Sequence, residues 1–294
     1  AVISTVVAIT SATPTVMGFT EDKRKEAGRQ FIDVGIAEEH AVTFAAGLAV
    51  SGYKPVVSIY SSFYQRAYDQ ILHDVCIQKL PVTLIFDRAG LVGSDGETHQ
   101  GIFDMSFLSA MPNMTIIAPS GIKELKEAMK FAEHFDGPIA IRFARGVAFP
   151  EIKEDINLQY GKGQILKEGS KDGNNAGGNV AIIAVGSMVE ETYKAIDMLE
   201  KEIVNPVFIK PMDTELIKRV AENHKHIIVV EEGIKKGGFG ESVETFILES
   251  GIDADVQVMA IDDRFVEQGN VALLREEIGI SYKNIYEKVM ELTR

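Results

Sequence analysis

The stretch FIDVGIAEEHAV, residues 31–42, changes from one kind of secondary structure to another within one short segment. Its first residues, 31–34, are mostly apolar and predict a buried strand, and Gly35 then breaks the pattern. Glu38 opens a predicted helix over residues 37–50. Open α/β sheets bind their ligands beyond the carboxyl ends of their strands, so a glutamate at this junction is a candidate functional residue.

The same alternation of strand and helix continues along the chain. Because the predicted strands are apolar almost throughout, the alternation favours a parallel sheet that is covered by helices on both faces. Strands are predicted over residues 4–10, 31–34, 55–60, 82–86, 114–117 and 138–142, and further helices over 61–78 and 121–134.

A second series of strands and helices follows a loop rich in glycine, asparagine and lysine at residues 168–179. Its strands are predicted at 180–186, 206–210, 226–232 and 256–261, with a helix over 187–201. The sequence therefore predicts two doubly wound α/β domains with mostly parallel sheets. We expect these domains to comprise residues 1–160 and 161–294.

The composition argues against several classes of protein. Hydrophobic residues make up 46% of the 294 residues, which is enough for a large core. The net charge of −13 argues against nucleic acid or an anionic membrane as a partner, although local arginines can still bind a small anion. The single cysteine, Cys76, excludes an intrachain disulfide and is consistent with a reducing compartment, so we expect a cytoplasmic protein. No apolar run reaches the roughly 18 residues of a membrane-spanning helix.

Aromatic and basic residues follow the predicted strand 55–60. Tyr60, Phe63 and Arg66 lie at the turn and on the first helical turns, where they offer an aromatic face and a cation to a bound ring. The simpler interpretation is a pair of core aromatics beside a solvated arginine. Glu38 has a simpler interpretation too, because the helix dipole favours a carboxylate in the first turn without any function.

The segment with the most candidate residues is DRAGLVGSDGETHQGIFD, residues 87–104. Between its glycines stand Asp95, Glu97, Thr98, His99 and Gln100. Such a polar loop after a core strand is typical of a functional loop. A metal site at Asp95, Glu97 and His99 is a weaker alternative, because no matching pair of helical ligands supports it. A serine hydrolase is excluded, since no Gly-x-Ser-x-Gly elbow occurs.

Two arginines follow the last predicted strand of the first domain, in IRFARGVAFP, residues 141–150. Arg142, Arg145 and Arg88 together would be able to hold a phosphate by charge-assisted hydrogen bonds, although paired surface arginines are the alternative. The segment KKGGFGES, residues 235–242, is neither a Walker A loop nor a dinucleotide fingerprint. We interpret it as a structural turn between a strand and a helix.

Three of these stretches together resemble the transketolase family of thiamine-diphosphate enzymes. They are VGIAEEHAVTFAAGLAVSGYKPVVSIYSSFYQRAYDQILHDV, DRAGLVGSDGETHQGIFD and the Arg-Gly of IRFARG. The resemblance extends over nearly the whole chain and implies a pyrimidine-binding domain at 1–160 and a transketolase C-terminal domain at 161–294. Within the family, HDVCIQKLPV and the length of the 87–104 loop point to the branch that makes 1-deoxy-D-xylulose 5-phosphate.

The resemblance implies roles for individual residues. Glu38 would hydrogen-bond the pyrimidine ring of thiamine diphosphate and act in catalysis, whereas Glu39 lies one residue later and does not match. Phe63 and Arg66 would also bind the cofactor. Residues that match the substrate pocket are Tyr60, Arg66, Arg88, Asp95, His99 and Arg145. Of these, Arg88 and Arg145 would take a phosphate, and His99 with Asp95 would act in catalysis on hydroxyls or a carboxylate.

The implied reaction joins pyruvate to D-glyceraldehyde 3-phosphate with loss of carbon dioxide. Relatives hold the diphosphate and Mg²⁺ with a Gly-Asp-Gly run and an asparagine further on, and this chain lacks that pair. We therefore expect no metal ligands here. We expect the chain to be a fragment that is inactive alone, to need an N-terminal diphosphate-binding domain, and to form a homodimer.

Three alternatives remain open at this point. The chain could be the C-terminal subunit of a split transketolase, which transfers a two-carbon unit without decarboxylation. It could be the β subunit of a 2-oxo acid dehydrogenase. It could also be a chain without enzymatic activity that only dimerises.

Overall fold

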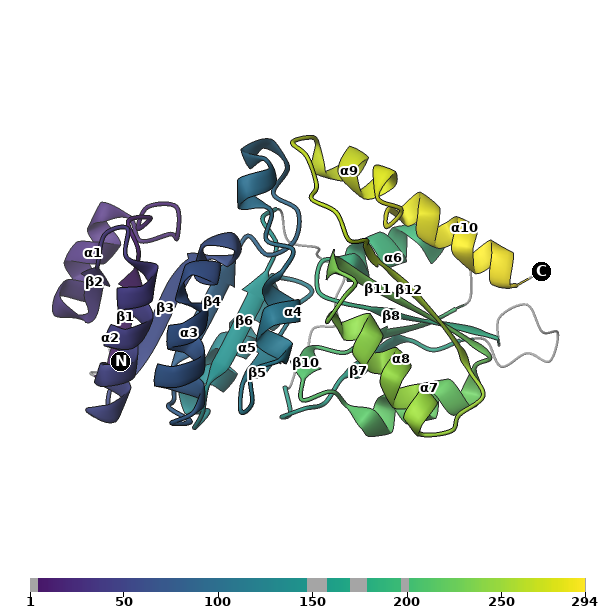
Figure 1. The fold of residues 1–294 in the computed structure, drawn as a ribbon, viewed down its shortest axis with the longest axis horizontal. Helices are drawn as coiled ribbons and strands as arrows, with labels where there is room; N and C mark the ends of the chain where they lie inside the picture. Colours follow the sequence, from purple (N-terminus) through teal and green to yellow (C-terminus); the bar gives the residue numbers. More distant parts are fainter. Residues whose placement is uncertain (1–4, 147–157, 170–178, 197–200, 294) are drawn as a thin grey trace.

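The computed structural model describes residues 5–146, 158–169, 179–196 and 201–293. Within this part of the chain the strands form two sheets, each flanked by helices. The two sheets lie side by side along the long axis of the molecule, and the chain termini lie toward its opposite ends (Figure 1).

The first sheet has seven strands in the order β10-β5-β6-β4-β3-β1-β2. All neighbouring pairs are parallel except β10 and β5. Six strands come from the first half of the chain: β1 Val6–Thr10, β2 Phe31–Asp33, β3 Lys54–Tyr60, β4 Thr83–Asp87, β5 Thr115–Ile117 and β6 Ile139–Phe143. These match the predicted strands, so the parallel α/β architecture is confirmed.

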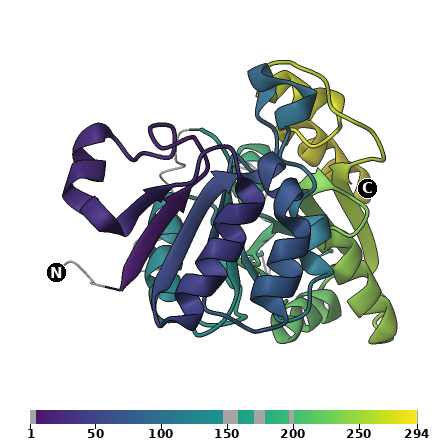
Figure 2. The same ribbon diagram turned by 60° about the vertical axis from the view of Figure 1, so that its left-hand side comes forward.

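Helices cover both faces of this sheet because the central strands are apolar on both faces (Figures 1 and 2). Leu84 and Phe86 of β4 pack with residues of α2, Glu38–Val50, whereas Ile85 between them packs with residues of α5, Ile122–His134. This alternation of direction along a strand is what buries successive apolar residues against opposite layers. A short helix α1, Glu21–Ala27, precedes β2.

Two details differ from the sequence prediction. β2 is an edge strand whose residues are partly or fully exposed, so the expectation of a buried strand at 31–34 is wrong. The predicted helix 61–78 is divided into a 3₁₀ helix η2, Ser61–Ala67, a single turn α3, Tyr68–Gln70, and a π-helix η3, Ile71–Cys76.

The second sheet has five strands in the order β12-β11-β8-β9-β7. They are β7 Gln164–Lys167, β8 Val180–Ala184, β9 Glu202–Asn205, β11 His226–Ile234 and β12 Asp255–Ile261. Successive residues of β8 again face different layers. Ile182 packs in a cluster with residues of two helices, α6 Met188–Ile196 and α10 Tyr282–Leu292. Ile183 packs in a cluster with residues of two others, α7 Thr214–Asn223 and α8 Phe239–Glu249. The sequence missed β7 and β9.

The predicted strand 206–210 is β10, Phe208–Lys210, but it does not join the second sheet. It pairs antiparallel with β5, and so extends the first sheet. Just before it, Asn205 is fully buried and donates from Nδ2 to Ser120 Oγ at 3.2 Å and to Glu124 Oε1 at 3.1 Å. The two halves of the chain therefore share a sheet and a hydrogen-bond network.

The two halves also share one hydrophobic cluster, which includes Leu108 from the first half and Val229 from the second. The domain boundary near residue 160 remains a prediction. Most of the glycine-rich loop 168–179 and the end of the predicted helix 187–201 lie outside the described residues. In the described part of the chain, no helix is both long and apolar enough to span a membrane.

Candidate functional site

The candidate residues gather at the carboxyl edge of the first sheet. Tyr60 ends β3, Arg88 follows β4 directly, and Arg145 comes shortly after β6. Because β6, β4 and β3 are adjacent parallel strands, their carboxyl ends meet at the same edge. Glu38 begins α2, which follows the neighbouring pair β1 and β2.

The entry into α2 is fixed by hydrogen bonds from the end of β1. The Ser11 hydroxyl donates to the Gly35 carbonyl at 2.7 Å and accepts from the Ala37 amide at 3.1 Å. Asp33 Oδ1 accepts from the Gly35 amide at 3.0 Å. These bonds set the sharp turn between β2 and α2, and so place Glu38 at the first position of the helix.

Glu38 is buried and paired with a cation. Its side chain is 3% exposed, and Arg66 Nη1 donates to Glu38 Oε1 at 2.6 Å. The Arg66 guanidinium in turn lies 4.8 Å from the centroid of the Phe63 ring. Arg66 is half exposed, so solvent screens this ion pair and reduces its contribution to stability. Glu38, Arg66 and Phe63 thus form one contact chain.

A second contact chain begins at Tyr60. The Arg88 guanidinium lies 4.2 Å from the Tyr60 ring centroid, and Arg88 Nη1 donates to Asp95 Oδ2 at 2.7 Å. Arg145 Nη1 reaches the same oxygen at 3.3 Å. Two guanidinium groups therefore share a single carboxylate oxygen, and their charges also act on the nearby Asp87 carboxyl. A phosphate has enough acceptor oxygens to pair with both arginines.

Phe63 joins the two contact chains. Its ring lies 5.3 Å from the Tyr60 ring and 5.2 Å from the His99 ring, the latter in an edge-on arrangement. His99 Nδ1 is 2.9 Å from the Thr98 hydroxyl. The structure thus brings together eight residues that the sequence selected, with Arg145 at the exposed rim. They are Glu38, Tyr60, Phe63, Arg66, Arg88, Asp95, His99 and Arg145.

The loop that carries Asp95 and His99 is closed at its base by backbone hydrogen bonds. The Gly90 amide donates to the Gly101 carbonyl at 2.7 Å, and the Gly101 amide donates back to Gly90 at 2.8 Å. A Cβ at Gly101 would lie 2.3 Å from the Arg88 carbonyl oxygen, so only glycine fits this close approach. This bridge between Gly90 and Gly101 therefore holds the base of the loop next to Arg88.

Burial changes the acid–base properties of two groups at the strand ends. Burial raises the pKa of the Tyr60 hydroxyl, and the nearby Arg88 charge opposes the rise. Burial also raises the pKa of the Asp87 carboxyl, against a hydrogen bond from the Arg88 backbone and the Arg88 charge. Tyr60 is thus held in its neutral form, in which the hydroxyl can donate a hydrogen bond to a ligand.

Arg142 is not part of this cluster, so its predicted role with Arg88 and Arg145 is wrong. Its side chain is buried, and its Nε donates to Asp104 Oδ2 at 2.8 Å while Nη2 donates to the Glu232 carbonyl at 3.3 Å. The reason is its position inside β6, where it pairs in register with Phe86 instead of following the strand end.

The weaker metal interpretation of Asp95, Glu97 and His99 is not supported either. Over the described ranges, no three side chains of His, Cys, Asp or Glu come together as a group that could hold a metal ion.

The glycine-rich segment 235–242 forms the structural turn that the sequence predicted. The amides of Phe239 and Gly240 at the start of α8 donate to the Glu231 carboxylate at 2.8 and 3.0 Å. Burial raises the pKa of the Glu231 carboxyl to about 7. The amides that would bind a phosphate are therefore occupied by a side chain of β11.

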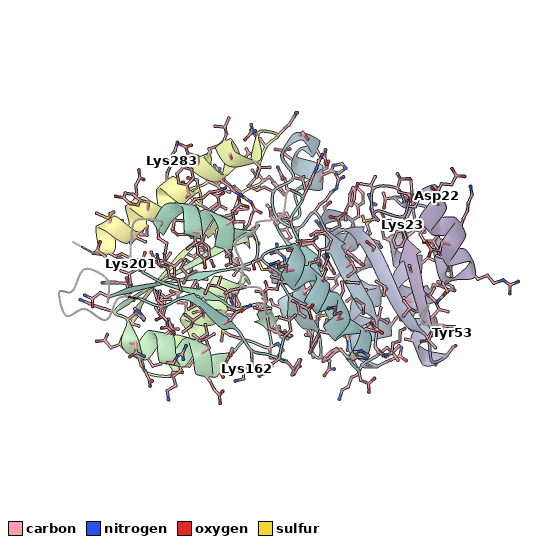
Figure 3. The ribbon with its side chains drawn as sticks, turned by 180° about the vertical axis from the view of Figure 1, so that it is seen from behind. Asp22, Lys23, Tyr53, Lys162, Lys201 and Lys283 are labelled. Atoms are coloured by element: carbon pink, nitrogen blue, oxygen red, sulfur yellow. The ribbon has the colours of Figure 1, made fainter. Side chains whose placement is uncertain are left out.

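A cavity of about 550 Å³ lies elsewhere, at the amino ends of the strands. It is lined by Val6, Lys54 and Thr83, which begin β1, β3 and β4, and by residues of α1 and α5. Lys23 of α1, which also lines it, lies near one end of the molecule, far from Lys201 and Lys283 (Figure 3). We place the functional site at the carboxyl edge instead, because the polar side chains that bind ligands gather there.

Comparison with known proteins identifies the family. The family model described as "Transketolase, pyrimidine binding domain" matches residues 2–149, and "Transketolase, C-terminal domain" matches residues 169–285. The chain belongs to the transketolase family. The transketolase pyrimidine-binding match thus contains every residue of the candidate cluster.

Two curated relatives within the transketolase family carry the same name. The 1-deoxy-D-xylulose-5-phosphate synthase of Clostridium perfringens (strain 13 / Type A) is 47% identical over 294 residues, covering 98% of this chain and 46% of that protein. The synthase of Dehalococcoides mccartyi is 44% identical over 296 residues, covering 98% of this chain and 44% of that protein. The chain therefore spans about half the length of the curated relatives it matches.

Two solved transketolase structures share the fold. A split-gene transketolase, described as an inactive beta4 tetramer, has a TM-score of 0.85 at 24% identity and covers 99% of this chain and 92% of that chain. The transketolase of Campylobacter jejuni has a TM-score of 0.80 at 19% identity, covering 98% of this chain and 44% of that chain. At these identities the similarity establishes the fold alone.

Proposed function

We propose that this chain forms the pyrimidine-binding and C-terminal parts of a thiamine-diphosphate enzyme that joins pyruvate to D-glyceraldehyde 3-phosphate. The product would be 1-deoxy-D-xylulose 5-phosphate, with loss of carbon dioxide. The observation that carries the proposal is the 47% identity to a synthase of this name over 98% of the chain. Identity to the two solved transketolases is 24% and 19%.

The cluster fits the pyrimidine ring of thiamine diphosphate. A buried carboxylate, Glu38, stands at the start of a helix, and the Phe63 ring lies beside its partner Arg66. Arg66 bonds to Glu38 Oε1, so Oε2 is the oxygen that a ring nitrogen would approach. When bound, thiamine diphosphate supplies the carbanion chemistry, and Glu38 would hold the proton that its ring exchanges.

The arginine cluster would bind the phosphorylated substrate. Arg88 and Arg145 would hold the phosphate, and Asp95 would keep the two guanidinium groups close together. His99 and Tyr60 would contact the hydroxyl or carboxylate groups of the reacting molecules. Asp95 and His99 are both proposed to act in catalysis as well.

The rest of the enzyme would come from outside this chain. We propose that an N-terminal diphosphate-binding domain supplies the Mg²⁺ ligands, that the enzyme works as a homodimer in the cytoplasm, and that the chain alone is inactive. The support is the length of the curated relatives, of which this chain covers about half.

The decisive assay uses the enzyme assembled with its diphosphate-binding domain. Release of carbon dioxide from pyruvate, stimulated by D-glyceraldehyde 3-phosphate and matched by formation of the deoxy sugar phosphate, is the expected result. Transfer of a two-carbon ketol unit without release of carbon dioxide would identify a transketolase instead. Transfer of an acetyl group to a lipoyl domain would identify the 2-oxo acid dehydrogenase alternative.

Glu38→Gln in the same enzyme tests the role of the carboxylate. We expect turnover to fall by about 10²-fold or more, the usual loss when acid–base assistance is removed. Glu39→Gln is the matched control, because Glu39 is the next residue of the same helix and is exposed. Near-normal turnover of Glu38→Gln would remove Glu38 from the proposed role.

A further inference from the structure

The loop with Asp95 and His99 is held from outside the first sheet. We define the site loop as residues 88–101 and the strap as residues 262–270, which connect β12 to α9, Val271–Glu277. The strap crosses from the C-terminal half to the site loop, and α9 lies beside this loop in the upper part of the view (Figure 1). The contacts between loop and strap are both apolar and polar.

Gln100 makes the side-chain polar contacts, and the Gly269 amide of the strap adds a backbone bond to the Gly93 carbonyl at 3.4 Å. Gln100 is 2% exposed, and its Oε1 accepts from the Val92 amide at 2.8 Å. Its Nε2 donates to the strap carbonyls of Glu267 at 3.1 Å and Val266 at 3.4 Å. One side-chain amide therefore ties the inside of the site loop to the strap, with both its donor and its acceptor groups used.

The apolar contacts form a small separate core. It consists of Leu91 and Ile102 at the two ends of the site loop, Ile261 and Val266 on either side of the strap's beginning, and Leu274 of α9. All of these side chains are buried. The strap is thus packed against the site loop, and the hydrogen bonds from Gln100 to the strap lie beside this buried core.

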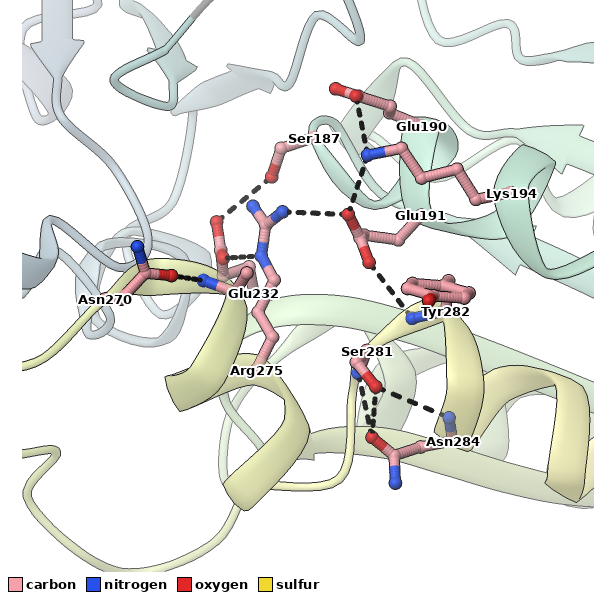
Figure 4. A network of polar contacts seen from close by, with 11 residues as sticks. Ser187, Glu190, Glu191, Lys194, Glu232, Asn270, Arg275, Ser281, Tyr282 and Asn284 are labelled. Atoms are coloured by element: carbon pink, nitrogen blue, oxygen red, sulfur yellow. Dashed lines mark hydrogen bonds and ion pairs between the residues drawn. The ribbon is translucent and has the colours of Figure 1, made fainter.

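The far end of the strap is fixed by charged groups. Arg275 of α9 donates from Nε to Glu232 Oε1 at 2.6 Å and pairs with Glu191 of α6 at 3.2 Å (Figure 4). The Ser187 hydroxyl donates to Glu232 Oε2 at 3.1 Å. A Cβ on Gly90 would lie 2.4 Å from that same oxygen, so Glu232 also packs directly against the base of the site loop.

We propose that Gln100 is a positioning residue for the phosphate end of the site, through which the C-terminal half fixes Asp95. Asp95 in turn holds Arg88 and Arg145 together. Loss of the Gln100 hydrogen bonds would let the loop move and separate these arginines from each other, without removing any group that contacts the substrates. The expected effect on substrate binding rests on the proposed function. The claim that Gln100 fixes the site loop does not.

The test replaces Gln100 by alanine. In the assembled enzyme we expect the KM for D-glyceraldehyde 3-phosphate to rise about tenfold, and the KM for pyruvate to change by less than about twofold, because only the first of these substrates carries a phosphate. A purely structural role would instead lower the amount of active enzyme and leave both KM values unchanged. That result, or equal rises in both, would overturn the proposal.

Hydrogen exchange on the 294-residue chain itself supplies the second measurement. Amides of the site loop, Val92 above all, should exchange at least about tenfold faster in Gln100→Ala. Gln164→Ala is the matched control, since Gln164 Nε2 also connects the two halves, by donating to Glu124 at 2.7 Å, but does so away from the loop. Unchanged exchange in Gln100→Ala would overturn the proposal even if the enzyme proves to catalyse a different reaction.

Gln100→Glu keeps the test informative if the alanine variant folds poorly. It retains an acceptor for the Val92 amide but places a carboxylate against the two strap carbonyls. We expect it to show the raised KM for the phosphorylated substrate as well. A wild-type KM in this variant would show that the strap bonds are not needed.

Discussion

At the residue scale, the site depends on how a few charges are shared. Glu38 has one cation, Arg66, whereas the single carboxylate of Asp95 serves both Arg88 and Arg145. The first arrangement pairs a buried carboxylate with one half-exposed cation. The second leaves each guanidinium with further N–H groups that can donate to an anion.

Replacing Arg145 by alanine tests the anion site. We expect the KM for D-glyceraldehyde 3-phosphate to rise about tenfold to a hundredfold, because a hydrogen bond between charged groups is worth about 1.5–3 kcal/mol. The KM for pyruvate should stay nearly the same, since pyruvate has no phosphate. Arg219→Ala, an exposed arginine of α7, is the control, and steady-state kinetics with each substrate varied gives the comparison. Equal changes for both substrates would contradict phosphate binding.

At the scale of elements, β11 supplies two neighbouring glutamates with different tasks. Glu231 faces the start of α8 and accepts its first amides, and Glu232 faces α9 and the site loop. Adjacent strand residues point to opposite faces, so one strand serves both layers. The glycine-rich turn 235–242 is therefore part of a helix start that is satisfied from within the protein.

Glu231→Gln should alter the pH dependence of stability. The folded protein raises the pKa of Glu231 from 4.5 to about 7, so between these values the folded state holds more protons than the unfolded state. The raised pKa contributes on the order of 3 kcal/mol to the free energy of unfolding. This contribution is fully present below about pH 4.5 and is lost as the pH rises through about 7.

Free energies of unfolding at about pH 5 and pH 8, from chemical denaturation, check this prediction. The glutamine variant should lose less stability over that range than the wild type. Glu241→Gln is the control, because Glu241 also accepts an amide, that of Gly237, at the start of the same helix, but is exposed. Parallel stability curves for wild type and Glu231→Gln would contradict the assignment.

At the scale of the whole molecule, the two halves are joined by buried polar contacts as well as by a shared sheet. β10 extends the first sheet, and Arg142 pairs with Asp104 while donating to the Glu232 carbonyl of the other half. A buried ion pair adds little net stability, but breaking it leaves an unpaired buried charge. We therefore expect the contact between the two halves to need both Arg142 and Asp104.

Arg142→Met should destabilise the chain by about 3–5 kcal/mol, the usual loss when one partner of a buried pair is removed. Adding Asp104→Asn to Arg142→Met should recover a large part of the lost stability, because asparagine leaves no unpaired charge. Its side-chain oxygen can still accept from the Met105 amide, which donates to Asp104 in the wild type. Chemical denaturation of the single and double variants gives the free energies of unfolding. A loss below about 1 kcal/mol for the single variant would show that the pair is not truly desolvated.

The sequence by itself determined the alternation of strands and helices, and with it which residues stand at strand ends. That information is local, because a strand, its terminating glycine and the first turn of the next helix are encoded within a few neighbouring residues. Glu38, Tyr60 and Arg88 could therefore be selected in advance. The roles given to them came from the family resemblance, and remain predictions.

The tertiary structure decided everything that depends on which distant segments meet. It placed β2 at an edge, added β10 to the first sheet, and paired Arg142 with Asp104 instead of with a phosphate site. It also connected Gln100 to a strap more than half the chain away. Strand order and the partners of buried charges depend on packing between residues remote in sequence, and no local pattern in the sequence records that packing.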